Sequence, residues 1–202
     1  MTSAPALRPG PLALVLSISI IFAWIASAIA LDQSLFATQR SSQLLGIGAL
    51  NGELLRTEGW WRLLASQYLH VHFPHMIFNA LGVLLIGSVV ERSGGLFDLA
   101  IVYVLGGSVG QLVSVISYPE LVSSGASQAL MALCGAAVLV CRARVGYITA
   151  AAVLAVQLVL DISAAHKIKA GHGWGLVAGV LLGAAILVVQ KRKGRPHFHH
   201  VA

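Results

Sequence analysis

Long apolar stretches recur along the chain and alternate with short polar segments. A helix needs about 20 mostly apolar residues to cross a bilayer, and six stretches approach this length: residues 11–31, 73–90, 97–117, 126–141, 145–162 and 174–190. This pattern predicts an all-α polytopic membrane protein. We expect a short cytoplasmic N-terminal segment, 1–10, then one six-helix membrane domain, 11–190, and a basic cytoplasmic tail, 191–202.

The first apolar stretch has two interpretations. Small residues at 26–30 are typical of the cleavage site of a signal peptide. The apolar stretch, however, is longer than the apolar region of a signal peptide, which usually has about 7 to 15 residues. We therefore expect the first stretch to be a retained membrane anchor.

The composition supports the membrane interpretation. Of the 202 residues, 57% are hydrophobic and 10% are charged, against roughly 25% charged residues in soluble proteins, and the mean hydropathy is +0.85. So little polar surface excludes a water-soluble enzyme, a disordered regulator and a nucleic-acid-binding domain. The net charge of +6 does not indicate nucleic acid, because four of the thirteen Lys and Arg residues flank the last span: Lys191, Arg192, Lys193 and Arg195.

The distribution of cations also predicts an orientation. Six spans place both termini on one side of the membrane, and cytoplasmic segments are rich in Lys and Arg. The basic tail therefore assigns the termini to the cytoplasm, which puts eight Lys and Arg residues inside and five outside. The compact layout favours a bacterial plasma membrane.

Polar side chains inside membrane spans are costly, so their positions are informative. Three sets of them stand at the beginnings of the second, fourth and sixth stretches. If the first span runs outward, these three spans all run inward, which brings the three sets to the outer leaflet. The sets predict a water-filled cavity open to the outside and lined by His70, His72, His75, Asn79, Ser123, Ser124, Ser127, Gln128 and His172.

The predicted cavity has the chemistry of acyl transfer. A serine nucleophile needs a base beside its hydroxyl, and His172 is an imidazole on another inward-running helix at the depth of Ser127. Ser127 also falls in the first turn of its helix, where free backbone N–H groups favour an oxyanion. His75 and Asn79 are four residues apart, hence on one helix face, and both can donate hydrogen bonds to developing negative charge.

A metal site is an alternative interpretation of the histidines. His70, His72 and His75 place three nitrogen ligands close together in the sequence. No carboxylate joins this cluster and no second histidine motif accompanies it in another span. We therefore expect no metal.

Asp161, near the outer end of the fifth stretch, also has two interpretations. It is positioned to orient His172 as the third member of a catalytic triad. Equally, it is positioned to face water or to pair with Lys167. The residues alone leave both open.

Four motifs match those of one family, in order and on the predicted helices: Trp61-Arg62, His70-x4-His75-x3-Asn79, Gly125-Ala126-Ser127 and His172-x2-Gly175-x3-Gly179. Each motif alone is weak, but the four together are specific. Over about residues 58–183, the chain resembles the rhomboid intramembrane serine proteases.

The resemblance implies a six-helix rhomboid-like bundle and a role for each motif residue. Ser127 would be the nucleophile and His172 the general base, as a dyad without an obligatory carboxylate, so that Asp161 would not be required. His75, Asn79 and the backbone N–H of Ser127 would hold the oxyanion. The resemblance implies no metal or organic cofactor. The implied partners are transmembrane protein substrates and the lipid bilayer, not nucleic acid.

We therefore expect an intramembrane serine endopeptidase that hydrolyses peptide bonds in or near transmembrane segments of membrane proteins. The alternative is a catalytically inactive rhomboid-like protein that binds client transmembrane helices for quality control or trafficking. The chain departs from the family pattern at two positions: Gln128 replaces the second glycine of the nucleophile motif, and Met131 stands where an aromatic residue is frequent. We expect Gln128 to contact substrate, because it places a side chain in the substrate groove.

Overall fold

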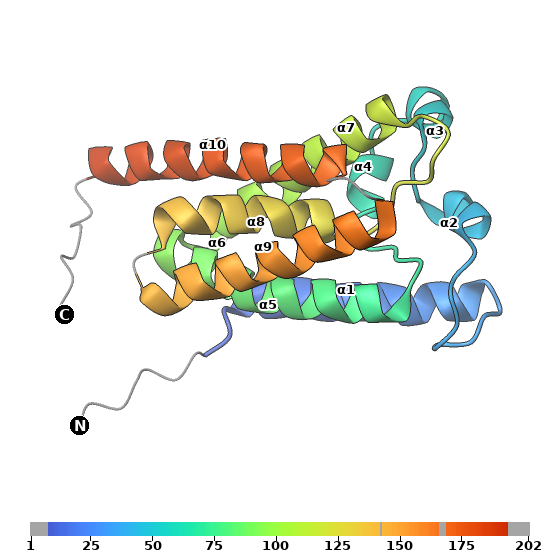
Figure 1. Cartoon of the computed structure of the whole chain (residues 1–202), viewed down its shortest axis with the longest axis horizontal. Helices are drawn as coiled ribbons and strands as arrows, with labels where there is room; N and C mark the ends of the chain where they lie inside the picture. The colour runs from blue at the N-terminus through green and yellow to red at the C-terminus, as the bar shows by residue number, and fades with distance from the viewer. Residues whose placement is uncertain (1–7, 142, 166–168, 194–202) are drawn as a thin grey trace.

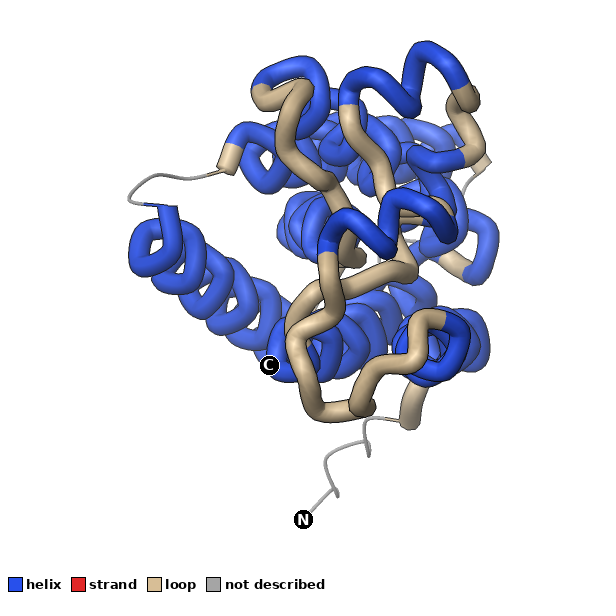
Figure 2. Tube along the Cα trace, turned by 90° about the vertical axis from the view of Figure 1, so that its right-hand side faces the viewer, coloured by secondary structure: helices blue, strands red, loops and turns tan. Residues whose placement is uncertain are grey.

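Long helices run side by side along one axis in the computed structural model (Figures 1 and 2). The structure describes residues 8–141, 143–165 and 169–193. Within these ranges the main helices are α1 (Pro11–Ala30), α5 (Phe73–Gly94), α8 (Ser127–Val140), α9 (Arg144–Ala165) and α10 (Ala170–Arg192). A further rod is composite and consists of α6 (Leu96–Ile101), the π-helical turn η1 (Val102–Gly106) and α7 (Gly107–Ser117).

These six rods correspond to the six predicted spans, and the all-α prediction is confirmed. Over the described ranges the chain forms helices and no β-strand, and five of the rods are long and apolar enough to cross a membrane. The exception is α8, whose 14 residues are too few to span a bilayer alone. Because α5, α7, α9 and α10 pack around it, 12 of its residues are buried. Helix α8 therefore contacts protein rather than lipid along most of its length.

Helices α8 and α10 approach each other through glycines. Gly175, Gly179 and Gly183 recur every four residues on α10, and a Cβ at each position would meet main-chain atoms of α8. In the absence of side chains here, the two backbones come into direct contact. This contact places the first turn of α10 against the first turn of α8.

Three short helices between α1 and α5 cover one end of the bundle (Figure 2): α2 (Ser41–Ile47), α3 (Gly52–Thr57) and α4 (Arg62–Ala65). Buried Arg62 organises this segment, because its guanidinium donates to the carbonyls of Leu45 and Ala49 at 2.7 and 2.6 Å and pairs with Glu58. The segment also holds the loop before α8, through backbone hydrogen bonds between residues 50 and 123.

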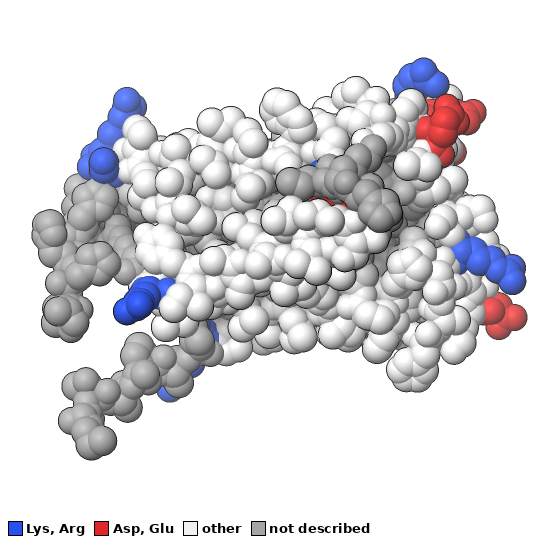
Figure 3. Space-filling view, viewed as in Figure 1, with Lys and Arg blue, Asp and Glu red and all other residues white. Residues whose placement is uncertain are grey.

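Charged side chains gather at the two ends of the molecule on the face shown in Figure 3. The exposed side chains along the long helices are mostly apolar, as a surface in contact with lipid requires; they include Val15, Phe22, Leu85, Val159 and Leu181. Helix α1 begins and α10 ends at the same end of the bundle (Figure 1). Residues 1–7 and 194–202 of the predicted terminal segments lie outside the described residues.

Candidate active site

Ser127 begins α8 and is held in place by the loop before it. Gly125 has a φ of 114°, in the left-handed region that favours glycine, and its N–H donates to the Ser66 carbonyl at 2.8 Å. The following N–H, of Ala126, donates to Nε2 of His70 at 3.2 Å. These contacts fix the turn from which the Ser127 side chain emerges.

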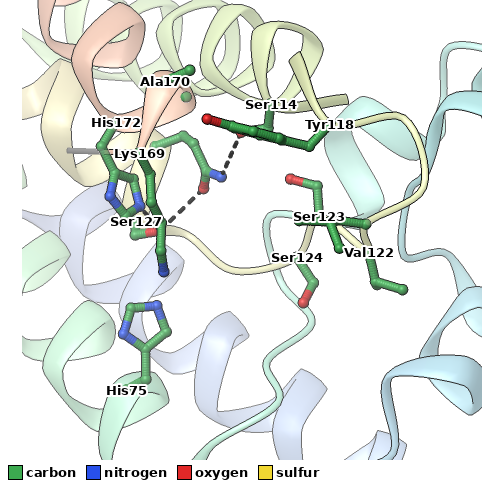
Figure 4. Close-up of a pocket in the computed structure, with 13 residues that line it drawn as sticks. His75, Ser114, Tyr118, Val122, Ser123, Ser124, Ser127, Lys169, Ala170 and His172 are labelled. Carbon is green, nitrogen blue, oxygen red and sulfur yellow. Dashed lines mark hydrogen bonds between the residues drawn. The ribbon is translucent and has the colours of Figure 1, made fainter. Parts of the chain in front are cut away.

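Ser127 and His172 form a hydrogen-bonded pair between two helices (Figure 4). The Oγ of Ser127 lies 2.8 Å from Nε2 of His172, which stands in the first turn of α10. The two residues are only 2% and 3% exposed. A hydroxyl at this distance from an unprotonated imidazole nitrogen can transfer its proton to it. The structure thus brings the predicted nucleophile and base into hydrogen-bonding contact.

The other nitrogen of His172 contacts a carboxylate. Nδ1 lies 2.7 Å from one oxygen of Asp161 and 2.9 Å from the other. The sequence left open whether Asp161 contacts His172 or instead faces water or pairs with Lys167. In the structure it contacts His172. Lys167, the alternative partner, lies outside the described residues. Ser127, His172 and Asp161 therefore form a chain of hydrogen bonds across α8, α10 and α9.

Gln157 belongs to the same cluster, although the sequence pattern did not single it out. Its Nε2 donates to Oδ1 of Asp161 at 3.1 Å from one turn earlier on α9. A glutamine and an aspartate four residues apart share one face of a helix. This spacing, within an otherwise apolar span, is the signal that identifies Gln157.

The hydrogen-bonded pair opens onto a cavity of about 330 Å³ (Figure 4). Its walls come from the first turns of α5, α8 and α10, from the last turn of α7 and from the segment that joins α7 to α8. All three polar sets that were expected at one level of the membrane therefore contribute to one cavity, although His70, His72 and Asn79 of the first set do not line it. The polar side chains that line the cavity with Ser127 and His172 include His75, Ser114, Tyr118, Ser123, Ser124, Gln128 and Lys169.

Gln128 competes with His172 for the Ser127 hydroxyl. Its Oε1 lies 3.1 Å from Ser127 Oγ and 3.4 Å from Nε2 of Gln111. The Ser127 hydroxyl therefore faces two acceptors, the imidazole nitrogen and this amide oxygen. Gln128 also lines the cavity, and its contact with substrate stays a prediction.

His75 and Asn79 occupy different positions relative to the cavity. His75 lines it from the first turn of α5. Asn79 is fully buried one turn further along, where its Nδ2 donates to the His75 carbonyl at 2.9 Å. Asn79 does not belong to the described residues that line the cavity. Of the two predicted oxyanion donors, the structure thus places only His75 at the cavity wall.

His70 is a structural residue of the loop before α8. Its buried imidazole accepts the N–H of Ala126 through Nε2, and Nδ1 lies 3.2 Å from the Tyr68 carbonyl. Burial, and to a smaller extent the nearby His75, lower the pKa of His70 to about 3. The neutral ring therefore donates through Nδ1 to the carbonyl and accepts through Nε2.

The structure gives no support to a histidine metal site. His72 is exposed, and its Nδ1 lies 3.3 Å from Oγ1 of Thr38. Both ring nitrogens of His70 contact the backbone, at Ala126 and Tyr68. In the part of the chain that the structure describes, no group of three His, Cys, Asp or Glu side chains is arranged to hold a metal ion.

Comparison with known proteins identifies the family. The model of the rhomboid domain matches residues 57–189, more than half of the chain. The chain belongs to the rhomboid family. The matched region of this rhomboid contains all of its candidate site residues: Ser127, His172, His75, Asn79 and Gln128.

Similar rhomboid proteins occur in bacteria and plants. The chain is 28% identical to Rhomboid protease GluP of Bacillus subtilis over 149 residues, which are 71% of this chain and 29% of GluP. It is 32% identical to RHOMBOID-like protein 5 of Arabidopsis thaliana over 164 residues, 77% of this chain and 51% of that protein. It is 29% identical to Putative rhomboid protease YdcA of B. subtilis over 156 residues, 74% of each protein. The chain spans about half the length of RHOMBOID-like protein 5 and less than a third of GluP.

Proposed function

We propose that this rhomboid is an intramembrane serine endopeptidase that cleaves peptide bonds in or near transmembrane segments of membrane proteins. The observation that carries the proposal is the 2.8 Å distance between Ser127 Oγ and His172 Nε2 at the wall of a cavity in the membrane domain. Two similar proteins are named rhomboid proteases, one of them putatively, which supports the same activity here.

The first half of the reaction forms an acyl-enzyme. Ser127 Oγ attacks the carbonyl carbon of the substrate while its proton moves to Nε2 of His172. An Oγ–C bond forms and the carbonyl oxygen becomes an oxyanion. When this intermediate collapses, the C–N bond breaks and His172 returns the proton to the leaving nitrogen.

Water completes the reaction. A water molecule from the cavity attacks the acyl carbon and gives a proton to His172. The C–Oγ bond then breaks, Ser127 regains its proton from His172, and the second product leaves as a carboxylic acid. The cavity is lined by polar side chains, which are suited to hold this water.

The oxyanion is stabilised by donors at the cavity wall. Ser127 is the first residue of α8, so its backbone N–H is free of the helix and can donate to the developing charge. His75 supplies a second donor from α5. Asn79 is the third candidate, although its amide has to turn from the His75 carbonyl toward the cavity to reach the oxyanion.

The substrate has to present an extended peptide bond to Ser127. A transmembrane helix must therefore unwind locally, which favours substrates with small or helix-breaking residues near the outer membrane boundary. Gln128 contacts the residues beside the cleaved bond and restricts their size.

The basic residues at the end of α10 support a cytoplasmic position for both termini. Lys191, Arg192 and Lys193 extend from this end of the bundle, and such residues accumulate on the cytoplasmic side. The cavity then opens toward the opposite, outer face. The assignment to the plasma membrane of a bacterium, made from the sequence, stays a prediction.

Labelling of the purified protein with a fluorophosphonate in detergent tests the proposal. The probe forms an Oγ–P bond, releases fluoride and transfers the serine proton to the base, so it reports an activated serine. We expect the wild type to be labelled, Ser127→Ala to be unlabelled and His172→Ala to be labelled far more slowly. Ser19→Ala, which changes a serine of α1 that does not line the cavity, is the control and should be labelled like the wild type.

The alternative function gives a different outcome in the same experiment. A folded wild type that does not react would exclude the protease and favour a rhomboid that binds client helices without cleaving them. The contact between Gln128 and the Ser127 hydroxyl is the feature that such an inactive protein would use to keep the serine unreactive.

A further inference from the structure

Asp161 lies where it can control His172, although a Ser-His dyad does not require a carboxylate. The residue is 1% exposed. Three nitrogen atoms converge on its two oxygens: Nδ1 of His172 at 2.7 Å, the backbone N–H of Lys169 at 3.1 Å and Nε2 of Gln157 at 3.1 Å. A buried carboxylate is costly unless its oxygens are hydrogen-bonded, and here both oxygens are.

This set of contacts determines the tautomer of His172. An ionised carboxylate can only accept hydrogen bonds, so Nδ1 of His172 has to carry a proton. In the neutral ring Nε2 is then the acceptor. Nε2 is also the nitrogen that faces Ser127 Oγ at 2.8 Å, so the base has its free electron pair directed at the hydroxyl proton.

We propose that Asp161 is a positioning residue of this rhomboid, which holds the reactive tautomer and orientation of His172 and stabilises the imidazolium that forms during catalysis. The proton moves between Ser127 Oγ and Nε2 only, and Asp161 stays ionised throughout. When His172 takes this proton, its positive charge lies beside the carboxylate and away from bulk water, where ion pairing is effective. The inference rests on the proposed function and adds a third member to the dyad.

A purely structural role is the competing explanation. Asp161 also connects α9 to the start of α10, because it accepts the backbone N–H of Lys169. Removing it could therefore loosen the helix ends without any effect on proton transfer. The test needs a variant that keeps the shape of the side chain and a readout that a loosened helix end would not change.

Asp161→Asn is this variant, and Glu91→Gln is its matched control. Both changes neutralise a buried carboxylate with little change in size. Glu91 accepts the N–H groups of Leu12 and Ala13 at 3.2 and 3.0 Å, so it also supports the start of a helix. It stands 16 residues after His75 on α5, about 24 Å along the helix from the cavity.

The first readout is the kinetics of fluorophosphonate labelling in detergent. For Asp161→Asn we expect the maximal labelling rate to fall on the order of 10- to 1000-fold, with the concentration for half-maximal rate unchanged. This is less than the about 10⁴-fold loss caused by the same change in a protease with an obligatory triad. Glu91→Gln should lower the melting temperature but leave the maximal labelling rate as in the wild type.

The second readout is the ring of His172 itself, by nuclear magnetic resonance of protein labelled with ¹⁵N-histidine. We expect a protonated Nδ1 with a strongly deshielded proton in the wild type. The signal should be absent in His172→Gln, shifted in Asp161→Asn and unchanged in Glu91→Gln. The wild-type spectrum alone reports the contact between Asp161 and Nδ1 of His172. The resonance measurement therefore remains decisive if Asp161→Asn does not fold.

The outcomes separate this inference from the proposed function. A wild type that is never labelled overturns the protease proposal, while the resonance still reports whether Asp161 holds the His172 tautomer. A labelled wild type together with an unaffected Asp161→Asn overturns the positioning role. A wild-type spectrum in which Nδ1 of His172 carries no proton also overturns the positioning role of Asp161.

Discussion

Gly179 of α10 lies directly against the backbone of Ala132 of α8, so that a Cβ at position 179 would overlap the Ala132 carbonyl oxygen. One turn closer to the cavity, a Cβ at Gly175 would lie 2.6 Å from the Gln128 carbonyl oxygen. His172 stands at the beginning of this same contact. The distance between its imidazole and Ser127 therefore depends on how closely the two backbones approach.

Gly179→Ala should separate the two helices and impair the site. The methyl group overlaps main chain, which cannot move as a flexible side chain can, and overpacking of this kind costs about 1 to 3 kcal/mol. We expect a lower melting temperature and a loss of fluorophosphonate labelling of at least tenfold. Gly173→Ala is the matched control, since a Cβ there has no neighbour within 4 Å; it should be labelled normally. Equal labelling of both variants would mean that close helix contact is not needed.

Gln128→Gly should make Ser127 more reactive. The change removes the amide oxygen that lies 3.1 Å from the Ser127 hydroxyl and leaves His172 as the acceptor. A hydrogen bond contributes about 0.5 to 1.5 kcal/mol, so we expect labelling to be about 2- to 10-fold faster.

Gln128→Met separates the hydrogen bond from the volume of the side chain. It keeps a long side chain in the cavity but removes the acceptor, so it should accelerate labelling as Gln128→Gly does. Only Gln128→Gly should also improve the cleavage of substrates with a bulky residue at the cleaved bond. Labelling of both variants at or below the wild-type rate would show that Gln128 does not restrain the serine.

Asn79→Ala should slow cleavage, because one candidate oxyanion donor is lost. Removal of such a donor costs about 10²- to 10³-fold in general. Since Asn79 donates to the His75 carbonyl in this structure, we expect a smaller loss, about 10-fold, and a larger loss for His75→Ala. Turnover of a transmembrane substrate by each purified variant measures both. If Asn79→Ala turns over substrate as fast as the wild type, Asn79 contributes to packing and not to oxyanion binding.

The number and order of the helices were predictable because membrane spans have a required length and composition. The residues at which the helices begin and end were less predictable. Helix α10 begins at Ala170 rather than at the predicted 174, because hydropathy places His172 outside a span although its side chain is buried in the protein. Helix α8 is short for a related reason, since neighbouring helices replace lipid around it.

The candidate site was predictable only in part. Ser127, His172 and His75 carry recognisable chemistry at motif spacings, and the structure brings them to one cavity. The contact of Asp161 with His172 depends on the rotation of α9 about its own axis, which one sequence does not determine. The orientation of the Asn79 amide toward the His75 carbonyl likewise depends on side-chain packing that no periodicity reports.

His70 should make the fold sensitive to acid. In the folded protein its pKa is lowered to about 3, first by burial and then by the nearby His75, against a smaller opposing effect of the hydrogen bond to Tyr68. The unfolded chain has a pKa near 6.5 at this residue and therefore binds the proton more tightly than the folded chain. The stability that neutral His70 contributes is complete above about pH 6.5 and is lost as the pH falls toward 3.

Thermal unfolding in detergent at several pH values tests this expectation. Protonation would remove the acceptor at Nε2 for the Ala126 N–H and leave a charge in a buried site. By pH 5 the cost should reach about 2 kcal/mol. His70→Gln keeps a hydrogen-bonding side chain that does not titrate, so its melting temperature should fall less between pH 7.5 and 5 than that of the wild type, whatever its value at pH 7.5. Parallel curves for the two proteins would show that His70 is not the acid-sensitive group of this loop.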